Sequence, residues 1–173
     1  MSTRHVLTER LDLRPMAPED AEVLFPILSD PRIWWYDPEL RHTDLEQTRA
    51  YAVRAADRWT PGPSYWTVRL RASGEVIGSG GVQRHEPTSW NLNYRIAPAA
   101  QGHGYATELA LEALRVAHAA DPDSAVIAWI DEHNTPSRRV AERVGLLDQG
   151  VRPTPNDGRP RVAYADRPLP GAP

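Results

Sequence analysis

Apolar and polar side chains alternate in a series of short segments, and this pattern predicts β-strands. In RLDLRP (10–15), two leucines alternate with charged residues before a proline ends the run. The segments 64–71, 75–85 and 89–96 follow one another through short turns at Ser73-Gly74 and Pro87-Thr88, which predicts an antiparallel meander. The continuous apolar run SAVIAWI (124–130) predicts a buried strand. Two more strands are expected near 147–152 and 160–166.

Apolar residues at helical spacing alternate with these strands. They predict helices over 17–28 and about 104–119. Another helix should begin at Thr43, with Glu46 at capping-box spacing, and run to about residue 58. A shorter one should begin at Thr135 as its cap and end at Gly145. The order β-α-α-β-β-β-α-β-α-β-β predicts a single-domain α/β protein, with one mixed sheet and helices on both faces. We expect a core over 8–166 and a flexible tail over 167–173.

The composition narrows the classes of function. The 173 residues carry a net charge of −3, too little positive charge to predict general nucleic-acid binding. The chain has no cysteine, which excludes disulfides, thiol catalysis and cysteine-ligated zinc. No apolar segment reaches the length of a membrane span or a secretion signal, so we expect a cytoplasmic protein with no membrane partner. All 20 basic side chains among Lys and Arg are arginine, a bias that genomic base composition explains.

The segment QGHGYATE (101–108) places two glycines directly before a predicted helix. Such a loop either caps the helix or holds a phosphate group against the helix N-terminus. The Walker pattern requires a lysine, and the chain has none. The dinucleotide pattern requires a third glycine where Ala106 and Thr107 stand. The residues of this loop alone leave both the capping and the phosphate-binding interpretations open.

A third pattern fits better. Gln101-Gly102-His103-Gly104-Tyr105-Ala106, after a strand and before a helix, resembles motif A of the GCN5-related N-acetyltransferases (GNAT). About 30 residues later, NTPSRRVAERVGL (134–146) resembles a second segment of that family, in which an Asn after a strand precedes a Ser three residues on. The resemblance covers about residues 8–166. The segments LTERLDLRPMAPEDAEVLFPILSD and GYATELALEAL are most similar to the bacterial-like RimJ/RimL subgroup.

This resemblance implies a sheet that splays open between the strands 89–96 and 124–130, with acetyl-CoA bound in the opening. Backbone groups of Ile96 and Ala97 would hold the pantetheine arm, and N–H groups near 94–96 would polarise the thioester. The pyrophosphate would lie on the loop residues, namely Gln101, Gly102, His103, Gly104, Tyr105 and Ala106. Asn134 would contact the pantetheine, although Asn also suits a helix cap. Ser137 would contact the cofactor and act as the general acid, or else only satisfy the helix end.

The acceptor amine must lose a proton before it attacks, so a base is expected near the opening. Asp131, Glu132, His133 and Glu86 are candidates, and we select Asp131 and Glu86. The family resemblance places acceptor binding in the loop that holds Trp34, Trp35 and Tyr36, whose aromatic rings can hold a cationic amine.

The sequence therefore predicts an N-acetyltransferase that acts on a protein N-terminus or a small amine, without a metal and with a homodimer as its assembly. Two alternatives stay open. One is a module that binds acyl-CoA without turnover, and the other is a nucleotide-binding protein.

Overall fold

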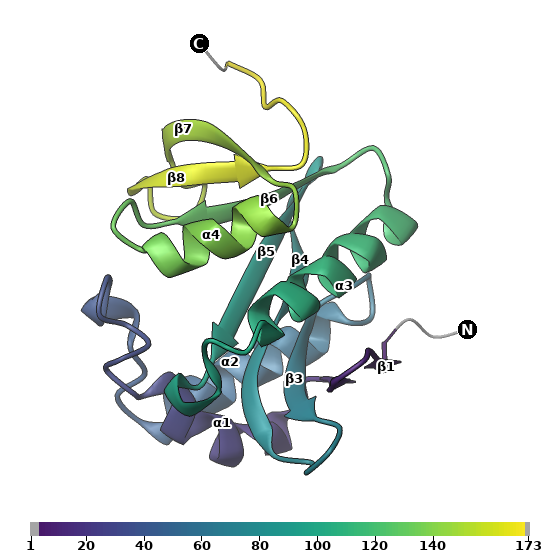
Figure 1. The fold of residues 1–173 in the computed structure, drawn as a ribbon, viewed down its shortest axis with the longest axis vertical. Coiled ribbons are helices and arrows are strands. Elements are labelled where there is room, and N and C mark those ends of the chain that lie inside the picture. The colour runs from purple at the N-terminus through teal and green to yellow at the C-terminus, as the bar shows by residue number, and fades with distance from the viewer. Residues whose placement is uncertain (1–3, 172–173) are drawn as a thin grey trace.

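A computed structural model describes residues 4–171. Its centre is one sheet of eight strands in the order β1-β2-β3-β4-β5-β6-β8-β7 (Figure 1). Every neighbouring pair is antiparallel except β5 and β6, which run parallel. The strands are β1 (Val6–Leu7), β2 (Leu11–Pro15), β3 (Tyr65–Leu70), β4 (Val76–Glu86), β5 (Ser89–Ile96), β6 (Ala125–Ile130), β7 (Leu147–Pro153) and β8 (Pro160–Ala165).

Four α-helices cover both faces of the sheet, as the sequence predicts. They are α1 (Ala21–Leu28), α2 (Leu45–Arg58), α3 (Tyr105–Ala120) and α4 (Thr135–Arg143). The apolar side of α3 packs on one face, where it shares a core with Trp66, Leu92 and Val126. Helices α1 and α2 pack on the other face, in a second core that includes Tyr65. Neighbouring residues of β3 thus enter different cores because successive side chains of a strand point to opposite faces. None of the helices that the structure describes is long and apolar enough to cross a bilayer.

The sheet opens between β5 and β6. Their parallel pairing joins only Ser89–Asn91 with Ala125–Ile127. Beyond that point β5 stays paired with β4, while β6 continues along β8 as far as Ile130. Figure 1 shows the two strands diverging, with the loop before α3 and the start of α4 on either side of the gap. The splayed sheet implied by the family resemblance is therefore present.

The approach of β4 to β5 depends on glycine at two positions. A Cβ on Gly78 would lie 1.9 Å from the Arg95 carbonyl oxygen, and one on Gly80 would lie 2.4 Å from the Asn93 carbonyl oxygen. No side chain fits at either distance. The residues GSGG (78–81) therefore fix how closely β4 supports the strand that borders the opening.

Three details differ from the sequence predictions. Strand β1 was not predicted, because two paired residues carry no readable periodicity. The cap of α2 is Asp44, not Thr43: the Asp44 carboxylate accepts from the Gln47 N–H at 2.9 Å, and the Gln47 side chain accepts from the Thr43 N–H at 2.7 Å. The Asp44 cap is thus supported by a hydrogen bond between Gln47 and the residue before the cap.

The predicted flexible tail is also wrong for its first residues. Arg167 donates to the carbonyl oxygens of Pro122 and Asp123, both at 3.0 Å. Leu169 packs on a small core beneath β6 and β8, and the Pro170 carbonyl accepts from Arg152 at 2.8 Å. Arg167 thus bonds this segment to the loop before β6, and Leu169 packs it against the sheet. Residues 172–173 lie outside the described part of the chain.

Candidate active site

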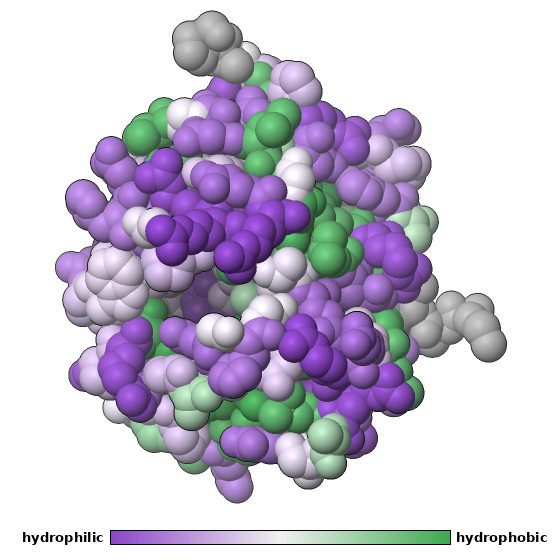
Figure 2. Space-filling view, viewed as in Figure 1, coloured by the Kyte–Doolittle hydropathy of each residue, from purple (hydrophilic) through white to green (hydrophobic). Residues whose placement is uncertain are grey.

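A cavity of about 430 Å³ lies at the opening between β5 and β6. The loop before α3, the first turns of α4, the end of β5 and the connection between α1 and α2 form its walls. Figure 2 shows the surface hollowed beneath α4, with hydrophilic side chains along the α4 rim. The cavity brings together most of the residues that the sequence assigns to the cofactor: Ile96, Gln101, Gly102, Gly104, Tyr105, Ala106, Asn134 and Ser137.

The glycine loop has the backbone conformation of an anion cradle. Gly102 and Gly104 have φ angles of 80° and 81°, in the left-handed region that favours glycine. Gly104 is the N-cap of α3, and no side chain of the described residues caps this helix. The first N–H groups of the helix therefore lack intrahelical partners where the loop faces the cavity. These N–H donors and the helix dipole have the polarity that suits a negatively charged group.

The turn between β1 and β2 contacts the glycine loop on the side away from the cavity. Arg10 donates to the His103 carbonyl oxygen at 2.7 Å and to the Glu108 carboxylate at 2.7 Å. Thr8 and the Arg10 N–H donate to the same carboxylate, at 2.5 and 2.8 Å. Burial opposes ionisation of Glu108, but these hydrogen bonds outweigh it and lower its pKa from 4.5. Arg10 thus occupies the His103 carbonyl on the side of the loop away from the cavity. Glu108 lies in the first turn of α3, where a carboxylate complements the helix dipole, and it also anchors the loop.

Three residues predicted to bind the cofactor have positions or hydrogen bonds that differ from the expectation. The His103 side chain does not line the cavity; its ring stacks on Tyr105 with centroids 5.6 Å apart. The Gln101 side chain lines the cavity but donates to the Ile96 carbonyl at 3.0 Å. The Ala97 N–H is already bonded to the Ile77 carbonyl at 2.7 Å and Ala97 does not line the cavity, so its N–H is not free for a ligand.

The backbone of β5 still presents free donors. Because the Ala97 N–H points to β4, the alternation of a strand directs the N–H groups of Tyr94 and Ile96 the other way, into the opening. These are the strand N–H groups that the family resemblance places near the thioester. The positions are consistent with that expectation.

Ser137 and Tyr94 meet at the narrow part of the opening. The Ser137 hydroxyl donates to the Tyr94 hydroxyl at 3.1 Å, and the Tyr94 hydroxyl donates to the Ser137 carbonyl at 2.9 Å. Burial raises the pKa of Tyr94 to about 12, against a smaller lowering by the Ser137 hydrogen bond. The phenol is therefore protonated at neutral pH. Sequence reasoning used only the backbone near Tyr94; strand alternation, which points its side chain to the α4 face, was the available signal.

Asn134, not Thr135, is the cap of α4. Its side-chain oxygen accepts from the Ser137 N–H at 3.3 Å. The expectation that Thr135 takes this role is wrong, because the chain turns into the helix one residue earlier. The cap fixes Ser137 in the first turn, and the amide nitrogen of Asn134 stays available at the cavity wall.

The two carboxylates predicted as bases are not brought to the cavity. The Asp131 carboxylate accepts from Arg161 at 3.0 Å and from the His133 N–H at 2.9 Å, so its oxygens are already engaged. Glu86 is exposed at the β4–β5 hairpin, next to the start of β5 rather than its splayed end. Neither residue lines the cavity. Glu86 and Asp131 thus do not face this cavity, although both are close in sequence to the strands that border it.

The three adjacent aromatic residues separate. Trp34 is buried in the core of α1 and α2, where its indole N–H donates to the Leu28 carbonyl at 2.6 Å. Trp35 and Tyr36 line the cavity with the glycine loop. Only two of the three rings can therefore contact a ligand there.

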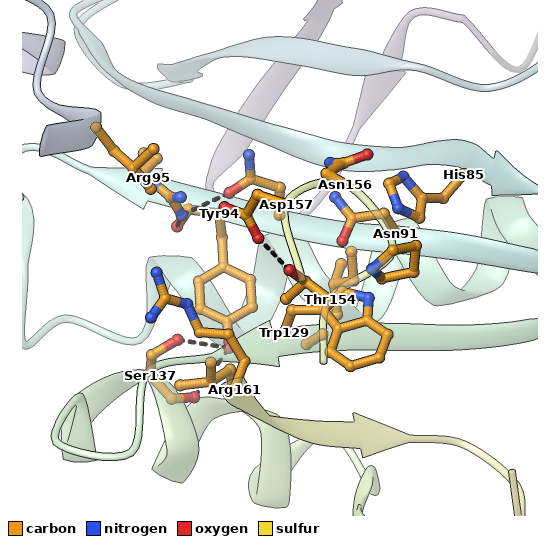
Figure 3. A pocket seen from close by; sticks show the side chains of 16 residues that line it. His85, Asn91, Tyr94, Arg95, Trp129, Ser137, Thr154, Asn156, Asp157 and Arg161 are labelled. Atoms are coloured by element: carbon orange, nitrogen blue, oxygen red, sulfur yellow. Dashed lines mark hydrogen bonds between the residues drawn. The ribbon is translucent and has the colours of Figure 1, made fainter. Parts of the chain in front are cut away.

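A second cavity, of about 230 Å³, lies on the α1–α2 face of the sheet (Figure 3). It shares Tyr94, Arg95 and Ser137 with the first cavity, so the two meet at the splayed end of β5. Its other walls combine polar and apolar side chains from four strands, the β7–β8 loop and the α1–α2 connection; they include His85, Asn91, Asn93, Trp129 and Asp157. Sequence reasoning missed these residues. Alternation in 89–96 puts Asn91, Asn93 and Arg95 on one face, but nothing local shows that this face is hollow.

Comparisons with known proteins identify the family. Residues 10–147 match the family model described as an acetyltransferase (GNAT) domain. The chain belongs to the GNAT acetyltransferase family. It is 30% identical over 151 residues to YkkB, an uncharacterized protein of Bacillus subtilis (strain 168), covering 82% of this chain and 84% of that one.

Solved structures show the same fold. An acetyltransferase of the GNAT family from Bacillus anthracis superposes with a TM-score of 0.78 at 23% identity, covering 93% of this chain and 96% of its own. RimL, described as a ribosomal L7/L12 alpha-N-protein acetyltransferase in complex with coenzyme A, has a TM-score of 0.74 at 19% identity, with 95% and 97% covered. These neighbours establish the GNAT fold for this chain.

Proposed function

We propose that this GNAT protein transfers the acetyl group of acetyl-CoA to a primary amine by direct attack, without a covalent enzyme intermediate. One observation carries the proposal: two cavities, one lined by the glycine loop and α4 and the other by β4, β5 and the β7–β8 loop, meet at Tyr94 and Ser137. Such an arrangement lets a thioester enter from one cavity and an amine from the other. The two reactants are then held together, which replaces a collision in solution.

The first cavity has the chemistry that coenzyme A requires. The uncapped N-terminus of α3 and the glycine loop offer N–H donors to a pyrophosphate. Arg139 and Arg143 also line this cavity, four residues apart on α4, and neither forms an ion pair within the described residues. Like charges at this spacing repel each other. A phosphate group of the coenzyme would relieve that repulsion.

When bound, the coenzyme supplies an activated thioester carbonyl. The N–H groups of Tyr94 and Ile96 would face the oxygen of that carbonyl and stabilise negative charge as it develops. The amine nitrogen forms a bond to the carbonyl carbon, and the carbon–sulfur bond breaks. The amine loses one proton to solvent and the departing thiolate gains one, so protons balance.

Ser137 and Tyr94 would act on the departing sulfur. Burial raises the pKa of the Tyr94 hydroxyl to about 12, far from neutrality. We therefore assign them hydrogen-bond donation to the thiolate rather than complete proton transfer. Asn134 positions Ser137 through the helix cap and presents its amide nitrogen to the same cavity.

We also propose that the chain belongs to the RimJ/RimL subgroup, forms a single domain over its whole length, is cytoplasmic and assembles as a homodimer. An alternative function is a module that binds acyl-CoA without turnover. It is favoured by one observation, that the predicted bases Asp131 and Glu86 line neither cavity.

Two measurements on the purified chain decide between these functions. Calorimetric titration with coenzyme A measures binding, and release of free thiol from acetyl-CoA with a panel of amines measures turnover. We expect binding together with amine-dependent thiol release. Binding of coenzyme A without thiol release in the presence of any amine would establish the non-catalytic module. Protection against thermal unfolding by ATP or NAD, with none by coenzyme A, would establish a nucleotide-binding protein.

A further inference from the structure

The second cavity has walls that are fixed before any ligand arrives. On its outer side lie Leu40, from the α1–α2 connection, and the β7–β8 loop. Asp37, from the same connection and only 6% exposed, receives hydrogen bonds from both Arg159 and Arg161 of β8 or its approach. Arg159 also pairs with Glu39. These ion pairs join the two loops, so the cavity does not depend on a ligand to form.

The size of the cavity limits the ligand. Its volume of about 230 Å³ lies below the roughly 300–1,000 Å³ of sites for drug-sized molecules. A molecule of the size of one amino acid is compatible with this space. Asn91, Asn93 and His85 supply polar groups along its length, and Figure 3 shows Asn91 and His85 at the end of the cavity away from Ser137.

The charges around the cavity are balanced except at one point. Arg161 is neutralised by Asp37 and Asp131. Asp157 is engaged by the Thr154 hydroxyl and by the Arg159 N–H. Arg161 and Asp157 therefore already have partners and do not need a charged group from a ligand.

Arg95 is the exception. Its guanidinium lies over the Trp34 ring, 4.8 Å from the centroid. Its Nη1 donates to the Asn93 side-chain oxygen at 2.6 Å and to the Tyr94 carbonyl at 3.2 Å. Its Nε is buried without a partner, and no carboxylate of residues 4–171 forms an ion pair with it. A partly buried guanidinium without a counter-charge is unfavourable, and a planar carboxylate is the group that it binds best.

We propose that the acceptor is a small primary amine that carries a carboxylate, of which a free α-amino acid is the simplest form, and that Arg95 binds that carboxylate. The inference rests on the proposed acetyl transfer. Arg95 lines both cavities, so a carboxylate on it lies beside the point where the thioester would be presented. In an α-amino acid one carbon joins carboxylate and amine, which brings the nitrogen to the same place.

A protein N-terminus lacks this feature. Its first residue continues into an amide, which is neutral and gives Arg95 no counter-charge. The reaction itself is unchanged: a nitrogen–carbon bond forms, the carbon–sulfur bond breaks, the amine proton passes to solvent and the thiolate is protonated. Only the group that anchors the acceptor distinguishes the two substrate classes.

The experiment compares matched acceptors on the unmodified protein. Each set contains an L-amino acid, its carboxamide, the amine that lacks the carboxyl group, and a C-terminally amidated dipeptide with the same first residue; alanine, methionine, histidine and tryptophan define four sets. Thiol release gives kcat/KM for each compound. We expect the free acid of at least one set to exceed its carboxamide by about 30-fold or more, as loss of a charge-assisted bidentate pair implies.

Variants then test the residue. Arg95→Gln should remove the preference for the acid over the carboxamide and leave the KM for acetyl-CoA within about threefold, while Arg95→Lys should restore part of it. Arg54→Gln, an exposed arginine of α2 with no ion pair among the described residues, is the matched control and should retain the preference. Arg139→Gln should instead weaken binding of coenzyme A and leave the preference intact. A thermal melt of each variant confirms that it is folded.

The outcomes separate the two proposals. Turnover that is equal for acid and carboxamide, or turnover of the amidated dipeptides alone, overturns the inference and leaves acetyl transfer standing. A preference for the acid that persists in Arg95→Gln overturns the role of Arg95. No turnover of any compound, with coenzyme A bound, overturns acetyl transfer and the inference together.

Discussion

The hydroxyl of Tyr94, on β5, and Ser137, in the first turn of α4, hold each other by two hydrogen bonds, of 3.1 and 2.9 Å. They close the narrow end of the opening between β5 and β6, and both line the two cavities. The pair joins an element from the middle of the chain to one more than 40 residues later. Its position is what links the proposed cofactor cavity to the acceptor cavity.

Removal of either hydroxyl should slow turnover. We expect Tyr94→Phe and Ser137→Ala each to lower kcat by about 10- to 100-fold, because donors to a departing group act mainly in the transition state. The double variant should lose less than the product of the single losses, since the two hydroxyls share one hydrogen bond. Steady-state kinetics on the three variants measures this coupling.

Tyr51→Phe is the matched control. Tyr51 is also partly buried, with its pKa raised to about 12 by that burial, its hydroxyl lies 3.2 Å from the Ser79 hydroxyl, and it lines neither cavity. It should change stability without a specific loss of kcat. If Tyr94→Phe behaves like Tyr51→Phe, the assignment of Tyr94 to the departing sulfur is wrong.

The contact between Arg10 and Glu108 should control affinity for coenzyme A from outside the cavity. We expect Arg10→Gln to raise the KM for acetyl-CoA by about 10-fold with little change in kcat, because the His103 carbonyl loses its donor and the N–H groups of the loop lose their orientation. Arg115→Gln is the control, as Arg115 pairs with Glu112 on the surface of the same helix. Equal KM values for the two variants would mean that the loop is rigid without Arg10.

The left-handed glycine before α3 should be required for the anion cradle. Gly104→Val should abolish coenzyme A binding, because a β-branched residue at a φ of 81° is strained and its side chain lies at the cradle. Gly150→Val provides equal backbone strain, at a φ of 80° with no atom near its Cβ and away from the cavities. Calorimetric titration should show binding lost only in the first variant, while both lose stability. Unchanged affinity in Gly104→Val would refute the cradle.

Glu108 should make stability depend on pH in the acidic range. Its pKa is lower in the folded chain than its usual 4.5, so its ionised form favours folding above that value. This contribution is lost as the pH falls through the folded pKa. Urea unfolding should show Glu108→Gln less stable than the original by about 1–2 kcal/mol at pH 7, with the difference shrinking as the pH falls below 4.5. A difference that stays constant from pH 7 to pH 3 would contradict this.

Gly78 should tolerate no side chain. Gly78→Ala should lower the free energy of unfolding by about 2–3 kcal/mol or more, because the added Cβ would lie 1.9 Å from the Arg95 carbonyl oxygen and must move β5. Gly62→Ala meets only the edge of Trp90 at 3.6 Å and should change stability by less than about 1 kcal/mol. Urea unfolding of both variants measures the difference. Similar stabilities would show that β4 and β5 can separate without cost.

Local patterns were sufficient for the elements of this fold other than β1. Period-two alternation in 64–71 and 89–96, helical spacing in 104–119 and the glycine loop depend on residues close together in the chain, and the structure has all of these elements. Residue chemistry alone predicted the wrong helix cap where two adjacent residues were equally suitable. Asp44 replaced Thr43 as a cap, and Asn134 replaced Thr135, because each adjacent residue offers a suitable oxygen and packing selects one.

The sequence by itself determined the order of the predicted strands and helices and the glycine motif before α3, which indicates the family, because each depends on residues close together in the chain. Only the tertiary structure decided which charges are free. It paired Asp131 with Arg161, left Glu86 at a distant hairpin, buried Trp34 and left Arg95, between two cavities, without a counter-charge from the described residues. Ion pairs, burial and cavities arise between segments far apart in the chain, so the group that we propose as the anchor of the acceptor is found only when β5, β8 and the α1–α2 connection are brought together.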